Sequence, residues 1–110
     1  MRESFLRNSS VFDAPHAVFI FLPEPFGLRE ATDCGMYAQT LMLAMAAHNV
    51  ASCPQTSLSF HPPIVREALG VDETLRLLFG ISFGYEDPSA KANACRVGRA
   101  ELDHAVSFHR

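Results

Sequence analysis

The sequence predicts a fold of α/β-type layers, in which a sheet of two or three strands is covered by one long helix. Residues 16–22 form an unbroken run of β-branched and aromatic side chains between prolines, which is typical of a strand buried on both faces. Residues 29–48 repeat apolar side chains at helical spacing, and residues 75–85 form a second long apolar run. Because strands alternate with helices, we expect crossover connections between the strands.

The composition limits the function classes. The 110 residues are 48% hydrophobic and 19% charged with a net charge of −3, so we expect one domain over residues 1–110 and no nucleic-acid partner. No apolar run approaches the roughly 20 residues that cross a bilayer, and the first residues do not resemble a signal peptide. We therefore expect a cytoplasmic protein that is not bound to a membrane.

The apolar content is high for so short a chain. A domain of this size buries only about two-thirds of its surface, and many charged residues usually cover the rest. We therefore expect part of the apolar surface to be covered by another chain or by the rest of a larger domain.

The first half of the chain contains one strand and one long helix. The run at 16–22 lacks polar alternation, which favours a central, parallel strand, and residues 1–14 are expected to form a flexible or exchanged N-terminal segment. In the helix at 29–48, Thr32 or Asp33 could cap or charge the first turn, and Asn49 is the expected stop. Because it is apolar around most of its circumference, we expect it to be buried on more than one side.

Shorter elements follow. A strand over residues 50–53 is expected to end at Pro54, and residues 55–60 to form a polar loop. A short helix over 64–69, opened by two prolines and capped by Gly70, precedes the strand at 75–85. Two glycines interrupt that strand, where another group is expected to approach the backbone: Gly80 and Gly84.

The last part of the chain is irregular. Residues 86–110 form an extended C-terminal arm, within which 100–109 are amphipathic and fit an arm or a short strand.

Two groups of residues could bind a ligand. The loop at 52–57 follows a strand, where α/β folds place ligands, and Gln55 with nearby amides could bond the polar edge of a planar heterocycle. From the residues alone, a solvated turn that ends the strand is the favoured alternative. Arg96 and Arg99, with Lys91, could clamp a phosphate, although isolated surface arginines are common.

The thiols and histidines carry weaker signals. The three cysteines have no close spacing, which fits reduced thiols, and Cys53 with His48 or His61 is a remote candidate nucleophile–base pair. The five histidines have no zinc-type spacing, so we predict no metal site.

A series of motifs in one order along nearly the whole chain resembles the C-terminal half of the FMN-dependent nitroreductases, in their nitrobenzoate-reductase-like branch. Each motif is weak alone, but the series is specific. The motifs are Arg7-Asn8, Ala14-Pro15-His16, Asp33-Cys34-Gly35-Met36, Gln39-Thr40-Leu41, Ser52-Cys53-Pro54-Gln55, Gly84-Tyr85-Glu86-Asp87-Pro88 and Arg96-Val97-Gly98-Arg99.

The resemblance implies an α+β fold with a nitroreductase-like mixed sheet and helices, of which this chain is the C-terminal half. It also implies an intertwined homodimer, with FMN at the subunit interface and the helix at 33–48 buried there. Such enzymes pass a hydride from NAD(P)H through FMN to nitroaromatic or quinone-like acceptors, so the flavin and no catalytic side chain carries the chemistry. Carried over by residue, Pro54, Gln55 and Thr56 line the isoalloxazine ring, while Arg99 and Arg96 bind the flavin phosphate.

One departure from the family pattern changes the FMN binding and the activity that we expect of this chain. Family domains are about twice this length, and the arginine-rich phosphate motif of their first half is absent here. We therefore expect a truncated, weakly active form that binds FMN weakly or not at all alone, or one to which a companion chain supplies the N-terminal half. The alternative is a non-catalytic oligomerising module that kept the fold and lost FMN.

Overall fold

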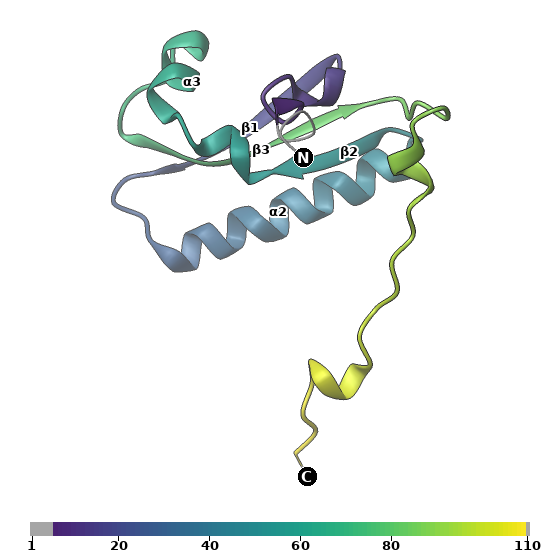
Figure 1. Cartoon of the computed structure of the whole chain (residues 1–110). Helices are drawn as coiled ribbons and strands as arrows, with labels where there is room; N and C mark the ends of the chain where they lie inside the picture. Colours follow the sequence, from purple (N-terminus) through teal and green to yellow (C-terminus); the bar gives the residue numbers. More distant parts are fainter. Residues whose placement is uncertain (1–5, 110) are drawn as a thin grey trace.

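A three-stranded antiparallel sheet organises the chain in the computed structural model, which describes residues 6–109 (Figure 1). Its order is β1-β3-β2, so β1 and β2 run parallel to each other with β3 between them. The long helix α2 provides the predicted crossover from β1 to β2. The bounds are β1 His16–Pro23, α2 Leu28–Ala47, β2 Ala51–Gln55, α3 Pro62–Leu69 and β3 Leu75–Gly84.

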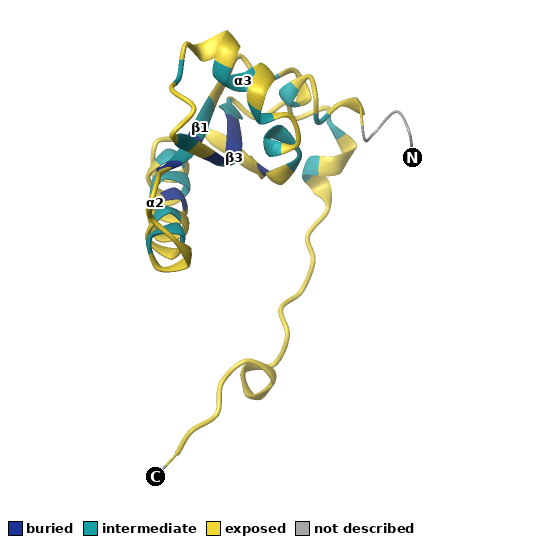
Figure 2. Ribbon diagram, turned by 90° about the vertical axis from the view of Figure 1, so that its left-hand side faces the viewer, coloured by how far each residue is buried: buried dark blue, intermediate teal, exposed yellow. Residues whose placement is uncertain are grey.

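The elements form layers on the two sides of this sheet. Helix α2 runs along one side, while the N-terminal turn and α3 lie on the other (Figures 1 and 2). Few side chains are fully enclosed, and Ile81 of the central strand is the most buried of them. The buried apolar residues are Ile20, Leu22, Ala38, Leu77 and Ile81.

The prediction that residues 16–22 form a central, parallel strand is wrong. β1 is antiparallel and lies at an edge of the described sheet, because β3 is the longest strand and pairs with both others. Its apolar run is only partly covered, and Val18, Phe19 and Phe21 are half-buried. The unbroken apolar pattern therefore belongs to a strand whose outer edge pairs with no other strand in the described part of the chain.

Helix α2 begins at Leu28, one residue before the predicted start, and its N-cap differs from the residues that the sequence suggested. Gly27, not Thr32 or Asp33, is the N-cap, and its backbone N–H donates to Glu30 Oε2 at 2.8 Å, which holds the pKa of the Glu30 carboxyl below its ordinary value. Asn49 ends the helix as predicted, with a left-handed φ of 58°. Ala38 alone among its described residues is buried, so within this chain the helix is covered on one side.

The segment after α2 also differs from the prediction. β2 continues through Pro54 to Gln55 instead of ending at residue 53, which an edge strand tolerates because the missing N–H faces away from the ladder. The expected loop at 55–60 is mostly a 3-10 helix, η2, over Thr56–Ser59. Gly70 is the C-cap of α3, as predicted, with a left-handed φ of 63°.

Close backbone approach at the two strand glycines is confirmed. A Cβ on Gly80 would lie 2.6 Å from Leu58 Cδ1 of η2, and a Cβ on Gly84 would lie 2.8 Å from Pro15 Cδ. These glycines therefore let η2 and the N-terminal segment pack directly on β3.

Beyond Gly84 the chain leaves the sheet. Two short 3-10 helices, Lys91–Ala94 and Leu102–His104, interrupt an otherwise extended arm that runs away from the body (Figures 1 and 2). Residues 100–109 contain the second of these 3-10 helices and no strand. Within residues 6–109, no helix has the length and apolar character needed to cross a membrane.

Candidate functional site

The end of β2 presents its residues alternately to solvent and to the interior. Pro54 and Thr56 are exposed, whereas Gln55 between them retains only 3% of its accessible surface. Gln55 stands opposite Gly80 in the register of β2 with β3, where no side chain on β3 competes for space. The strand period thus directs Gln55 inward and leaves its two neighbours on the surface.

Asn8 of the N-terminal segment holds the Gln55 side chain. Gln55 Nε2 donates to the backbone carbonyl oxygen and to Oδ1 of Asn8, each at 3.2 Å. Ser57 Oγ donates to the same Asn8 Oδ1, also at 3.2 Å. One amide oxygen therefore joins the residues on either side of Thr56 and fixes the start of η2.

Sequence reasoning missed this role of Asn8. The residue lies 47 positions before Gln55, and no spacing rule connects a polar residue in an N-terminal turn to a distant strand end. The Arg7-Asn8 pair at the start of the motif series was the signal that could have pointed to it.

The other amide atom of Gln55 lacks a partner. Gln55 Oε1 is buried and accepts no hydrogen bond within the described part of the chain. Because Nε2 already faces two oxygens, the amide cannot be turned over to exchange its donor and acceptor. A buried acceptor without a donor costs about 1–3 kcal/mol, so the strand end fits a group that brings one hydrogen-bond donor, as the single N–H of the oxidised FMN ring would.

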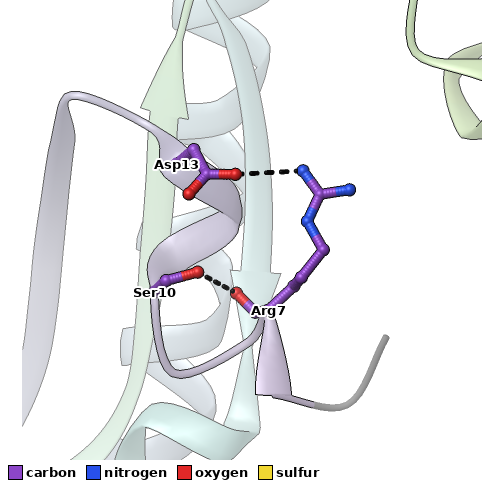
Figure 3. A network of polar contacts seen from close by, with 3 residues as sticks. All are labelled: Arg7, Ser10 and Asp13. Carbon is purple, nitrogen blue, oxygen red and sulfur yellow. Dashed lines mark hydrogen bonds and ion pairs between the residues drawn. The ribbon is translucent and has the colours of Figure 1, made fainter. Parts of the chain in front are cut away.

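The turn that carries Asn8 is strained. Val11, Phe12 and Asp13 have left-handed φ values of 50°, 57° and 62°, and this conformation costs an L-residue roughly 1–2 kcal/mol. An ion pair of 3.2 Å between Arg7 Nη2 and Asp13 Oδ2 closes the turn, and Ser10 Oγ donates to the Arg7 carbonyl (Figure 3). Such strain persists only where surrounding contacts hold it, as the Asn8 bonds to β2 and η2 do.

The structure does not bring the predicted phosphate-binding arginines to this strand end. Arg96 and Arg99 lie on the exposed arm, which leaves the body (Figure 1). Their hydrogen bonds within residues 6–109 go to nearby carbonyl oxygens: Asn93 and Cys95 for Arg96, and Val97 and Gly98 for Arg99. Both guanidinium groups therefore keep donors that could bind an anion.

Cys53 lies beside the site in β2. Burial of its sulfur raises the pKa of the Cys53 thiol, although the residue as a whole is exposed. A raised pKa lowers the fraction of reactive thiolate at neutral pH, which opposes a nucleophilic role. Among residues 6–109, no three His, Cys, Asp or Glu side chains gather where they could hold a metal ion.

Comparisons with known proteins identify the fold around this strand end. Residues 2–85 match the sequence profile of the nitroreductase family. The chain belongs to this family. It is 52% identical over 99 residues to nitroreductase NfnB of Mycolicibacterium smegmatis, and 33% identical over 103 residues to a 4-nitrobenzoate reductase of Nocardioides sp.. The backbone superimposes with a TM-score of 0.93 and 46% identity on the FMN-dependent nitroreductase NfnB from Mycobacterium smegmatis, solved in complex with NADPH.

The match covers most of this chain and less than half of each relative. It takes in 90% of the chain and 42% of NfnB, and 93% of the chain and 41% of the Nocardioides reductase. In the solved NfnB structure, 98% of this chain matches 48% of that chain. The 110 residues therefore form a nitroreductase-like α+β body that is part of the fold of these relatives.

Proposed function

We propose that this chain forms part of an FMN-dependent oxidoreductase that uses NAD(P)H to reduce nitroaromatic or quinone-like acceptors. The similarity to NfnB and to 4-nitrobenzoate reductases supports this class of reaction. When bound, FMN would supply the hydride chemistry, so the protein needs to bind, orient and shield rather than donate a nucleophile.

The geometry at the end of β2 carries the proposal. Pro54 and Thr56 are exposed on either side of Gln55, whose amide is fixed at one end and lacks a donor at the other. Pro54 offers a rigid apolar surface to a planar ring, and Thr56 offers a hydroxyl and a backbone amide to its polar edge. These residues orient a flavin ring, while Arg96 and Arg99 on the arm bind its phosphate.

We further propose that α2 forms the interface with a second copy of this chain. Its outer side exposes large apolar side chains, and Leu28 retains 87% of its accessible surface. The exposed members are Leu28, Met36 and Leu43, with Gly35 between Leu28 and Met36. A second helix can pack closely against small residues and cover this apolar surface, which matches the excess of apolar residues in the sequence.

The remaining part of the site comes, in this proposal, from polypeptide outside the 110 residues. The chain spans less than half the length of NfnB, and the outer edge of β1 pairs with no other strand in the described part of the chain, which leaves its partly covered apolar run for such a partner. The arginine-rich segment that the family uses for the flavin phosphate would lie in that partner.

A reconstitution assay tests the function. The purified chain, FMN, NADPH and 4-nitrobenzoate are combined with and without a polypeptide that comprises the unmatched part of M. smegmatis NfnB. We expect nitrobenzoate-dependent NADPH oxidation with the added polypeptide and little without it. A colourless dimer that binds no FMN in either mixture would contradict the proposal and favour a module that has lost its cofactor.

A further inference from the structure

We propose that Asn8 is a positioning residue for flavin binding: it holds the Gln55 side chain and the first turn of η2, and so sets the affinity for FMN. The inference rests on the proposed function, because it concerns the strand end that would face the flavin ring. It adds a residue from the N-terminal turn to a site otherwise built from β2 and the arm.

The contacts of Asn8 span the residues that would face the ring. Its Oδ1 accepts from Gln55 Nε2 and from Ser57 Oγ, at 3.2 Å each, and its backbone carbonyl accepts from Gln55 Nε2 at the same distance. Thr56 lies between these two anchored residues and is exposed. Fixing both neighbours of Thr56 also fixes the orientation of the Thr56 backbone.

The Asn8 contacts also determine which atom of the Gln55 amide remains unpaired. With both Nε2 hydrogens directed at oxygens of Asn8, the unpartnered atom is the acceptor Oε1. Without Asn8 the amide could rotate and present a donor or an acceptor. Preorganised groups bind more tightly because the cost of ordering them has already been met on folding.

A matched variant separates this role from the stability of the turn. Asp13→Asn breaks the ion pair with Arg7 in the same turn but leaves every Asn8 contact with Gln55 and Ser57 in place (Figure 3). Asparagine also tolerates the left-handed φ of 62° at this position. Asn8→Asp keeps the Oδ acceptor, and Ser57→Ala removes one of the contacts alone.

The test combines two measurements on the full chain. Hydrogen exchange of the Gln55 side-chain amide, followed by NMR without flavin, reports whether the amide is held. Equilibrium dialysis against FMN at high protein concentration reports the dissociation constant of the weak binding expected of this chain alone. Thermal unfolding by circular dichroism confirms that each variant remains folded.

We expect Asn8→Ala to remove the protection of the Gln55 amide and to raise the FMN dissociation constant about threefold to tenfold, the effect of one or two lost hydrogen bonds. Asp13→Asn should stay within about twofold of the wild type, a difference below that of one typical hydrogen bond, and Asn8→Asp should lose less affinity than Asn8→Ala because it keeps the Oδ acceptor. If Asn8→Ala does not fold, Ser57→Ala should show the same loss in smaller measure.

Two results would overturn the inference alone: unchanged protection of the amide in Asn8→Ala, or lost protection with unchanged FMN affinity. A wild-type chain that binds no FMN, alone or with the NfnB polypeptide, would instead overturn the proposed function, and the inference with it.

Discussion

Gly80 is the position where one added methyl group tests the packing beneath the site. In Gly80→Ala, the new Cβ would lie 2.6 Å from Leu58 Cδ1, 3.2 Å from Leu58 Cβ and 3.4 Å from Phe19 Cδ1. Leu58 Cδ1 can move away by side-chain rotation, but Leu58 Cβ moves only if η2 shifts. Such overpacking costs about 1–3 kcal/mol.

An opposing effect reduces this cost. Replacing glycine by alanine restricts the unfolded chain and stabilises the folded state by about 0.4–1 kcal/mol where the backbone accepts alanine. Gly80 is not among the glycines with positive φ, so that gain applies. We therefore expect a net loss of about 1–2 kcal/mol, which lowers the melting temperature by about 4–8 °C for each kcal/mol.

Urea and thermal unfolding followed by circular dichroism measure this loss, with Gly98→Ala as the matched control. Gly98 lies on the exposed arm, and a Cβ there meets nothing within 4 Å, so its stability should stay within about 0.5 kcal/mol of the wild type. A Gly80→Ala variant as stable as the wild type and Gly98→Ala would refute the close packing of η2 on β3.

Three further predictions concern assembly, pH and the thiol. Leu43→Glu, on the exposed side of α2, should convert a dimer to a monomer in light scattering after size-exclusion chromatography, while Leu69→Glu on α3 should not; dissociation by both or neither would exclude the α2 interface. Hydrogen bonds from Thr74 and Ser89 lower the pKa of Asp72 and Asp87, so the stabilisation present above about pH 4 should be lost as the pH falls through the lowered values. A urea midpoint that does not change between pH 6 and 3 would contradict this. Cys53→Ser should leave nitrobenzoate-dependent NADPH oxidation in the reconstituted mixture unchanged, because the raised pKa of the thiol makes it a poor nucleophile, and a large loss of activity would restore a role for the thiol.

The sequence predicted the elements better than their arrangement. Helical spacing located α2 to within a residue or so, and glycine and asparagine located its end and the cap of α3. Local chemistry sets these features, so a single segment contains the information. The order β1-β3-β2 depends on pairing between distant segments, because β1 pairs with residues at least 52 positions later and β2 with residues at least 25 positions later. An apolar run also has the same sequence pattern at the edge as at the centre of a sheet when another polypeptide covers it.

The candidate site was predicted in part for the same reason. Position in the chain pointed to Pro54, Gln55 and Thr56 as a strand end, and the structure places them there. The sequence could not show that the Gln55 side chain points inward, because that orientation depends on β2 continuing past Pro54. It also could not show that Asn8 forms hydrogen bonds with Gln55. Arg96 and Arg99 remain a prediction, since the arm holds them away from the sheet within this chain.

The most direct test of the account is the FMN affinity of the purified chain, measured by fluorescence titration with and without the polypeptide that comprises the unmatched part of NfnB. The account predicts weak binding by the chain alone, with a dissociation constant above about 1 μM, and binding at least tenfold tighter in the mixture. Tight stoichiometric binding by the chain alone, or no gain on mixing, would contradict the claim that these residues form one part of a shared flavin site.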